Sequence, residues 1–322
     1  MLARVTTATI AAALAVALGF SAPARAGVPE SRDPIILTIH DWTGQYITTH
    51  IMGRVLEEIG YKIKYQQADY IAQFAGLESG DLHIAMEMWE TTGKQAMEES
   101  LKTGKTVDLE VTGMDAKEEW WYPIYMKEKC PGLPDWKALN DCAEAFSTPE
   151  THPKGRYLGG PVTWAGFDDE RAEALGLDYE VVHAGTDAAL FAELQSAYER
   201  KAPFLGWVYA PHWAPFKYEG EWVEFPEYTD ACYDDPSWGM NPDAAYDCGK
   251  PFGWIKKVGW KAGEAKWPCA YETVRNFRIE NDAINAMISE VDLNDKKVDD
   301  VVENWIKENK STWSKWAACA GG

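Results

Sequence analysis

The stretch PIILTIHDWTG, residues 34–44, decides how this 322-residue chain is interpreted. Its apolar, β-branched run predicts a buried strand that ends at Asp41-Trp42 and passes into a glycine turn. The next segment, GQYITTHIMGRVLEEIG, has apolar residues at helical spacing and a glycine stop at Gly60, so it predicts an amphipathic helix. The chain therefore begins with a strand–helix unit whose strand finishes on a tryptophan.

The same unit recurs along the first third of the chain. YKIKYQQ, HIAMEMW and TVDLEVTG predict further strands, and YIAQFAGLESG and TTGKQAMEESLKTG predict the helices between them. This alternation predicts an α/β protein with a parallel, doubly wound sheet. Ligands of such sheets bind beyond the carboxyl ends of the strands. Trp42 ends the first strand and Trp89 ends the third, so we expect both at that edge.

A second series of strand–helix units follows a segment with Pro and Gly. RYLGGPVTW and FLGWVYA predict strands, with Trp164 and Trp207 at or just after their ends. We predict a first lobe over residues 27–122 and a second lobe over 123–224. Residues 225–322 then return to the first lobe and end in helices, so that the chain crosses between the lobes twice at a hinge.

The amino terminus and the cysteines both predict export. Arg4, an apolar run over residues 8–20 and the ending Ala24-Arg25-Ala26 are typical of a secretory signal peptide, residues 1–26, so we expect a periplasmic protein. An even number of cysteines in an oxidising compartment favours disulfides. Six cysteines allow fifteen different pairings. Proximity in the sequence favours the one with Cys130–Cys142 and Cys232–Cys248, which leaves Cys269–Cys319.

The charge and the tryptophan content narrow the class of ligand. A formal net charge of −20 disfavours nucleic acid and anionic membranes as partners and is compatible with cationic or neutral ligands. Sixteen tryptophans are a strong excess, and packing explains most of them. The four that stand at strand ends are the candidates for a binding site.

Four short motifs carry a resemblance to a known family: HDWTG, AMEMW, GPVTW and FLGWVYAPHW. With these motifs in this order, the mature chain resembles the glycine betaine/choline-type substrate-binding proteins of ABC importers, the OpuAC-like group. The resemblance implies a two-lobed periplasmic-binding-protein fold of type II-like topology, which closes on its ligand. It also implies a small methylated-amine ligand, permease and ATPase partners, and a monomer.

The resemblance further implies an aromatic cage around a methylated ammonium group. It places Trp89, Trp164 and Trp207 at cage positions of the betaine-binding pattern. It places Trp42 and the pair Trp120-Trp121 near cage positions of the choline-binding pattern, with Trp121 aligned to that pattern's tyrosine. A quaternary ammonium cannot donate a hydrogen bond, whereas ring faces attract it by cation–π contacts of roughly 0.5–2 kcal/mol each.

The other end of the ligand must meet acidic neighbours. The carboxylates near the tryptophans are Asp41, Glu87, Glu90, Glu118 and Glu119. Because like charges oppose a carboxylate ligand, trimethylamine N-oxide or choline is favoured, with Glu119 or Glu118 as the polar partner. Backbone N–H groups of the helix after Trp42 could hold an oxyanion, so glycine betaine or proline betaine stays open.

Rival classes find less support in the sequence. A secreted hydrolase would need a motif such as G-x-S-x-G or H-E-x-x-H, and the sequence has neither. A sugar-binding module would add Asn, Gln and Arg beside the tryptophans. No cofactor is expected. The Asp-rich stretch 230–247 could bind calcium, but it lacks EF-hand spacing and a disulfide-tied surface loop is favoured.

Overall fold

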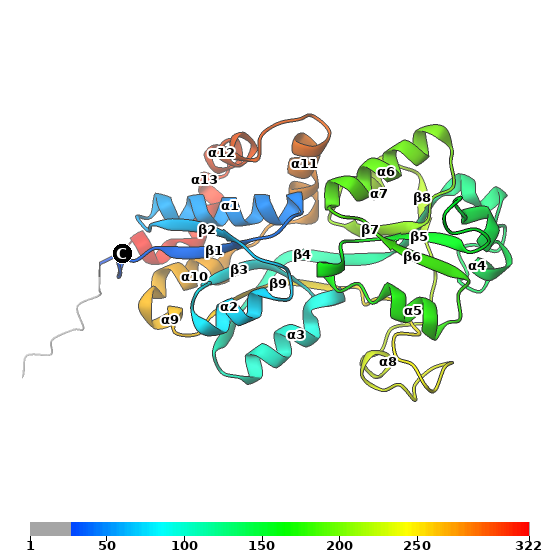
Figure 1. Cartoon of the computed structure of the whole chain (residues 1–322). Coiled ribbons are helices and arrows are strands. Elements are labelled where there is room, and N and C mark those ends of the chain that lie inside the picture. Colours follow the sequence, from blue (N-terminus) through cyan, green and yellow to red (C-terminus); the bar gives the residue numbers. More distant parts are fainter. Residues whose placement is uncertain (1–26, 322) are drawn as a thin grey trace, which may run out of the picture.

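A computed structural model describes residues 27–321 of the chain (Figure 1). The predicted signal peptide, residues 1–26, lies outside the described residues. Within them, none of the helices combines the length and the apolar character needed to cross a membrane.

Within residues 27–321, nine strands form one sheet. Eight of them follow the order β2-β1-β3-β9-β4-β7-β5-β6, and β8 pairs with β4 off this path. Their bounds are β1 Ile35–Ile39, β2 Ile63–Gln67, β3 Ile84–Trp89, β4 Thr106–Pro123, β5 Gly155–Gly159, β6 Tyr179–His183, β7 Gly206–Ala210, β8 Gly220–Trp222 and β9 Gly253–Trp260. The path divides into two half-sheets, each of which is the centre of one lobe in Figure 1.

We call the first lobe the half-sheet of β1, β2, β3, β9 and the start of β4 with its helices. These are α1 Thr43–Glu58, α2 Gln73–Ser79, α3 Glu90–Lys102, α9 Gly263–Lys266, α10 Pro268–Asn276, α11 Asn281–Asp292, α12 Val298–Glu308 and α13 Lys310–Trp316. Figure 1 shows α1 on one face of this half-sheet and α2 and α3 on the other.

The second lobe consists of the end of β4, strands β5 to β8, and the helices among and after them. These helices are α4 Ala138–Asp141, α5 Asp168–Ala174, α6 Asp187–Arg200, α7 Ala214–Lys217 and α8 Asp230–Asp234. Short 3₁₀ turns occur at Ile124–Glu128, Ala143–Phe146, Val162–Trp164 and Ala318–Gly321.

Strand β4 belongs to both lobes. Its residues from Thr106 to Ala116 pair with β9, and those from Lys117 to Trp121 pair with β7. The predicted strand ended at Gly113, whereas the observed strand continues for ten residues into the second lobe. The other crossing is the segment 223–252, which joins β8 to β9.

The α/β class is confirmed, but the prediction of a wholly parallel sheet is wrong. The pairs β1/β2, β1/β3, β5/β6 and β5/β7 are parallel, whereas β3/β9, β4/β9 and β4/β7 are antiparallel. Parallel pairs need a covering crossover helix. Each antiparallel pair named here involves β4, which leaves the first lobe, or β9, which begins after the chain has returned to it. Strand β9 also lies where the sequence predicted no strand.

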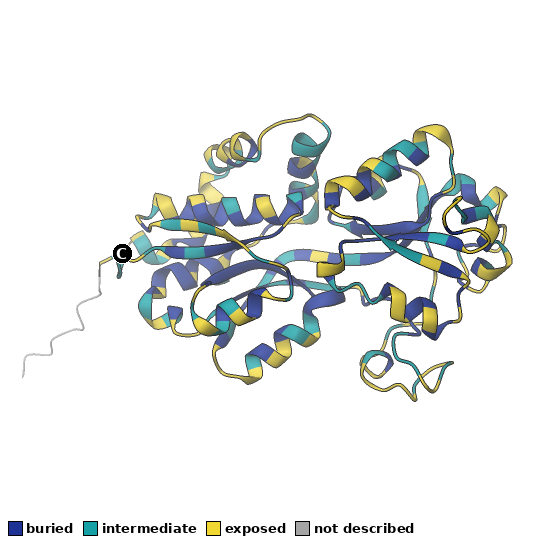
Figure 2. Ribbon diagram, in the orientation of Figure 1, coloured by how far each residue is buried: buried dark blue, intermediate teal, exposed yellow. Residues whose placement is uncertain are grey.

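Both lobes have buried apolar interiors and exposed helix surfaces (Figure 2). In α1, the apolar positions Ile47, Ile51 and Val55 are fully buried because they repeat at helical spacing on one face. Gly53, on another face of the helix, makes room for Tyr65 of β2, since a Cβ there would lie 2.1 Å from the Tyr65 hydroxyl. The first strand is thereby covered as its sequence predicts.

All three predicted disulfides are present. They are Cys130–Cys142, Cys232–Cys248 and Cys269–Cys319, with 12, 16 and 50 residues of separation. The last one ties α10 to the carboxyl-terminal turn, so it closes the longest loop.

We expect the Cys269–Cys319 bond to contribute the most stability. Loop-closure entropy gives about 4 kcal/mol for its loop and about 3 kcal/mol for each shorter one. The double variant Cys269→Ser/Cys319→Ser should therefore lose more free energy of unfolding than Cys130→Ser/Cys142→Ser. Urea unfolding measures both, and an equal or smaller loss for the first variant would contradict the loop-entropy account.

Candidate functional site

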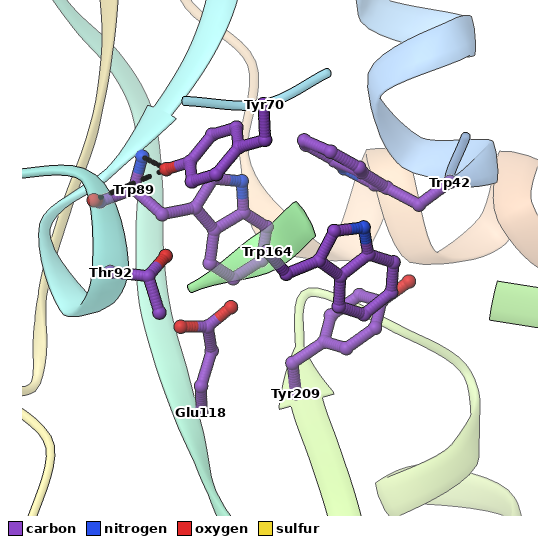
Figure 3. Close-up of a pocket in the computed structure, with 7 residues that line it drawn as sticks. All are labelled: Trp42, Tyr70, Trp89, Thr92, Glu118, Trp164 and Tyr209. Atoms are coloured by element: carbon purple, nitrogen blue, oxygen red, sulfur yellow. Dashed lines mark hydrogen bonds between the residues drawn. The ribbon is translucent and has the colours of Figure 1, made fainter. Parts of the chain in front are cut away.

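A small aromatic cavity lies where the two lobes meet (Figure 3). Its lining residues come from both lobes and from β4: Trp42, Tyr70, Trp89, Thr92, Glu118, Trp164 and Tyr209. The space open to the centre of a water-sized sphere is about 20 Å³, so the closed cavity suits a compact ligand.

One buried carboxylate holds two of the rings. Trp42 precedes α1 and Trp89 ends β3, and both indole Nε1 groups donate to Glu87 Oε2, over 2.9 and 3.1 Å. Thr48 Oγ1 donates to the other oxygen over 2.8 Å. Glu87 is 1% exposed, and burial raises its pKa although these three donors oppose the rise. Because the polar N–H edges of both indoles bond to Glu87, the ring faces stay available to a ligand.

Tyr70 and His40 brace the same wall. His40 stacks on Trp42 with ring centroids 4.9 Å apart, and Tyr70 meets Trp42 edge-on at 5.6 Å. The Tyr70 hydroxyl accepts a bond from the backbone N–H of Trp89 over 2.9 Å. Tyr70 follows the carboxyl end of β2, so three strand ends of the first lobe supply this wall.

The second lobe supplies Trp164 and Tyr209. Trp164 follows β5 in a 3₁₀ turn, and its Nε1 donates to Asp41 Oδ1 of the first lobe over 2.9 Å. The rings of Trp164 and Trp42 meet edge to face at 5.8 Å, and those of Tyr209 and Trp89 at 5.6 Å. Each lobe therefore completes the aromatic surface that the other begins.

Glu118 is the charged residue of the lining. It lies on β4 just after the strand changes partner, and it is 7% exposed. Burial raises its pKa to about 7, against the opposing charge of Lys250. Its Oε2 is buried and has no hydrogen-bond partner among residues 27–321. The Glu118 carboxyl group lines the cavity (Figure 3) and is available to the polar end of a ligand.

Three predicted site residues lie elsewhere. Glu119 pairs with Arg171, over 2.7 Å from Oε1 to Nη1, because successive residues of β4 point to opposite sides. Trp120 points farther into the second lobe, stacks on Tyr157 at 3.9 Å and donates to Asp168. Trp121 is buried against Gly220. None of the three lines this cavity.

Trp207 lies behind Trp164, on the side of that ring away from the cavity. Its ring meets that of Trp164 at 6.0 Å, it is 1% exposed, and it does not line the cavity. Its face is covered by the Lys250 ammonium, 4.3 Å from the ring centroid, and that ammonium donates to the carbonyl of Gly166. Trp207 therefore backs Trp164 in this structure.

The sequence analysis missed Tyr70, Thr92 and Tyr209. Tyr70 directly follows the strand YKIKYQQ, so the strand-end rule that selected Trp42 would have selected it. Tyr209 lies two residues after Trp207 and on the same side of β7. Thr92 lies in the first turn of α3, the helix after Trp89, and carried no distinguishing signal.

The Asp-rich stretch 230–247 uses its acids within the loop. Asp247 Oδ2 accepts bonds from the backbone N–H groups of Met240 and Asn241, and Asp235 accepts from Ser237. Among the described residues, the acidic and histidine side chains that converge closely lie outside this stretch. Calcium binding there stays a prediction.

The family profile of OpuAC, described as the substrate binding domain of the ABC-type glycine betaine transport system, matches residues 33–308. The chain belongs to the OpuAC family. It is accordingly a substrate-binding component of an ABC transport system and not an enzyme, so the hydrolase alternative is set aside.

Known relatives agree with this assignment. The chain is 32% identical over 297 residues to a trimethylamine N-oxide-binding protein of Pelagibacter ubique, covering 88% of this chain and 91% of that protein. Its fold is similar to a glycine betaine/L-proline-binding protein of Borrelia burgdorferi, with TM-score 0.70, 20% identity, and 88% and 96% of the two chains covered. It is also similar to a choline-binding protein in complex with choline, with TM-score 0.72, 14% identity, and 90% and 93% covered.

Replacing Glu87 tests whether it holds the wall of this OpuAC-family site. Glu87→Leu leaves two buried indole N–H groups without their acceptor, and each such loss costs about 1–3 kcal/mol. We expect the free energy of unfolding to fall by at least about 2 kcal/mol in chemical denaturation. Thr48→Val removes one donor to the same carboxylate and should cost about 1 kcal/mol. A Glu87→Leu variant as stable as the parent would show that Glu87 does not organise the rings.

Proposed function

We propose that this protein captures a small methylated amine, with trimethylamine N-oxide favoured, and delivers it to the permease of an ABC importer. The observation that carries the proposal is an aromatic cavity lined by the carboxyl group of Glu118 (Figure 3), one oxygen of which has no hydrogen-bond partner within residues 27–321. The similarity to a trimethylamine N-oxide-binding protein supports the same ligand. The predicted signal peptide and the disulfides support a periplasmic location.

The rings suit the methylated end of such a ligand. A trimethylated nitrogen bears positive charge on methyl groups that cannot donate hydrogen bonds, and aromatic faces attract it by roughly 0.5–2 kcal/mol per contact. Trp42 and Trp89 direct their N–H groups to Glu87, and Trp164 directs its own to Asp41. The faces and carbon edges of these rings are what remains for the ligand.

Glu118 suits the oxygen of an N-oxide. An N-oxide oxygen accepts hydrogen bonds, and a carboxyl group with a pKa of about 7 carries a proton for a large part of the time near neutral pH. A protonated Glu118 would donate to that oxygen. In an N-oxide the oxygen is bonded directly to the nitrogen, so the molecule is compact, as the small cavity requires.

The same site can be compared with three other candidate ligands. Choline is the second candidate, because an ionised Glu118 would attract the cation and accept a bond from its hydroxyl. Glycine betaine and proline betaine are less well served. Their carboxylate would face Glu118, and the seven lining residues include no Arg, Lys or His.

Capture would depend on closure of the lobes. Because each lobe carries half of the rings, the full set of contacts exists only when the lobes are together. A ligand shifts the equilibrium toward closure by its differential affinity for the closed state. The permease could then distinguish the loaded protein from the empty one.

Replacing the cavity tryptophans tests the site. In calorimetric titrations with trimethylamine N-oxide, choline, glycine betaine and carnitine, we expect one methylated amine to bind tightly. Trp89→Ala and Trp164→Ala should weaken that binding at least tenfold, because each removes about 1.4 kcal/mol or more of ring contact.

Trp305→Ala is the matched control. Trp305 stacks on Trp316 at the far side of the first lobe and should leave affinity unchanged. A neutral sugar serves as the negative ligand. If no methylated amine binds the folded parent protein, the proposed function is wrong.

The pH dependence distinguishes the N-oxide from the cation. The raised pKa of Glu118 keeps it protonated below about pH 7, where it can donate to an N-oxide, and ionised above, where it attracts choline. The ratio of the affinity for trimethylamine N-oxide to that for choline should therefore fall as pH rises through 7. Glu118→Gln keeps a donor and cannot ionise, so its ratio should stay constant. A ratio that changes equally in both proteins would rule out Glu118 as the polar partner.

A further inference from the structure

A second group of polar residues joins the lobes outside the ligand cavity. Asp187 begins α6 and His212 follows β7, both in the second lobe, whereas Asp292 ends α11 in the first lobe. One side-chain atom of each lies within 4.8 Å of the others. Figure 1 shows α11 facing the second lobe near the start of α6, so this group bridges the gap between the lobes.

Asp292 bonds to both lobes at once. Its Oδ2 accepts from Trp213 Nε1 of the second lobe over 2.9 Å, and its Oδ1 accepts from Thr43 Oγ1 of its own lobe over 2.7 Å. His212 Nε2 lies 3.7 Å from Asp292 Oδ2. The carboxylate is therefore a meeting point for donors from the two sides.

His212 is arranged as a donor and not as a metal ligand. Its Nδ1 accepts the backbone N–H of Ala214 over 3.2 Å, so the proton of the neutral ring is on Nε2. A metal would need Nε2 free and the proton on Nδ1, where that N–H points. His212 is fully buried, and Nε2 has no hydrogen-bond partner at normal distance within residues 27–321. It is aimed at Asp292.

Asp187 meets other acids in the closed arrangement. It is 5% exposed, and its Oδ1 accepts from the hydroxyl of Tyr209, which lines the cavity. Burial is the largest cause that raises its pKa to about 8, and Asp292 of α11 and Asp41 before α1 raise it further. The Tyr209 hydroxyl and the backbone N–H of Thr43 oppose the rise. With the lobes apart, an exposed aspartate has a pKa of about 4.

We propose that Asp187, His212 and Asp292 form a second closing contact, which sets ligand affinity without touching the ligand and takes up a proton at Asp187 when the lobes close. The inference rests on the proposed function, because it concerns the closure that a ligand drives. Tyr209 connects the two sites, since its ring lines the cavity and its hydroxyl bonds to Asp187.

The sign of the pH effect follows from the two states. Between the open and closed pKa values of Asp187, about 4 and about 8, closing takes up a proton, so closure weakens as pH rises. The upper limit is a tenfold loss of affinity per pH unit, and the loss ends above the closed value. Glu118 titrates at about 7 and overlaps this interval, so the test is made in the Glu118→Gln background, which keeps a donor and cannot ionise.

Titration of the mature protein with trimethylamine N-oxide across this interval tests the contact. We expect the affinity of the Glu118→Gln protein, which is the parent in this comparison, to fall three- to tenfold from pH 7 to 8.5. Calorimetry at pH 7.5 in buffers of different ionisation enthalpy should show a net uptake of protons. Asp187→Asn resembles the protonated acid and accepts from Tyr209, so its affinity should change less than twofold and its proton uptake should largely vanish. Asp178→Asn, at an exposed aspartate of the same lobe, should behave like the parent.

Three results would overturn the inference. Asp187→Asn could keep the parent's pH slope and proton uptake, the parent could show no slope, or the affinity could depend on added Zn²⁺ or on a chelator, which would make the group a metal site.

Failure of the proposed function would be recognised separately, as no binding by any methylated amine. In that case small-angle X-ray scattering of the ligand-free protein still tests the contact. The parent should expand between pH 6 and 9 and Asp187→Asn should expand less, whereas identical behaviour would refute the inference.

Discussion

The site depends on the burial of Glu87 beneath two indole rings. An indole N–H in a closed cavity needs an acceptor, and a methylated ammonium group offers none. Because Glu87 accepts from both Trp42 and Trp89, the protein meets this need by itself and the ligand meets only ring faces. The cost of burying a carboxylate is offset by three donors converging on it. The arrangement also fixes the angle between the rings, because both share one oxygen.

Strand β4 supplies the second constraint. Its backbone pairs with β9 before Lys117 and with β7 from Lys117 onward, so among the strands of residues 27–321 it is the one bonded to both half-sheets. Glu118 lies one residue past this change. Its position is therefore set by the hinge, while the rings around it come from the bodies of the lobes. A ligand held between rings and Glu118 contacts both lobes and the strand that joins them.

The sequence predicted the parts of this site that depend on strand ends. Trp42, Trp89 and Trp164 could be found because apolar runs, helical spacing and glycines locate where strands stop. Glu118 could not be separated from Glu119, because the predicted strand ended at Gly113 and gave no alternation beyond it. An acidic, polar stretch from Asp115 to Glu119 resembles a surface loop. It is a strand because β9 pairs with its first two residues and β7 with the other three, and both partner strands lie far along the chain.

Local sequence patterns could not predict which side chains meet across the two lobes. Trp207 and Tyr209 lie on the same side of β7, so alternation cannot tell which ring reaches the cavity and which lies behind it. That choice depends on how closely the other lobe approaches, which is a property of tertiary packing. Trp213 is similar, since its sequence context suggests packing alone, yet its N–H donates to Asp292 in the first lobe.

Closure of an acidic protein raises a problem that these cross-lobe contacts address. With a net charge of −20, bringing two surfaces together sets carboxylates against one another, as Asp187, Asp41 and Asp292 illustrate. Neutral indole donors relieve part of that opposition, because Trp164 bonds to Asp41 and Trp213 bonds to Asp292. Arginine or lysine at these points would hold the lobes shut without ligand. Bonds from uncharged indole donors add no positive charge, so closure depends on the ligand, and the remaining acid, Asp187, responds to protons.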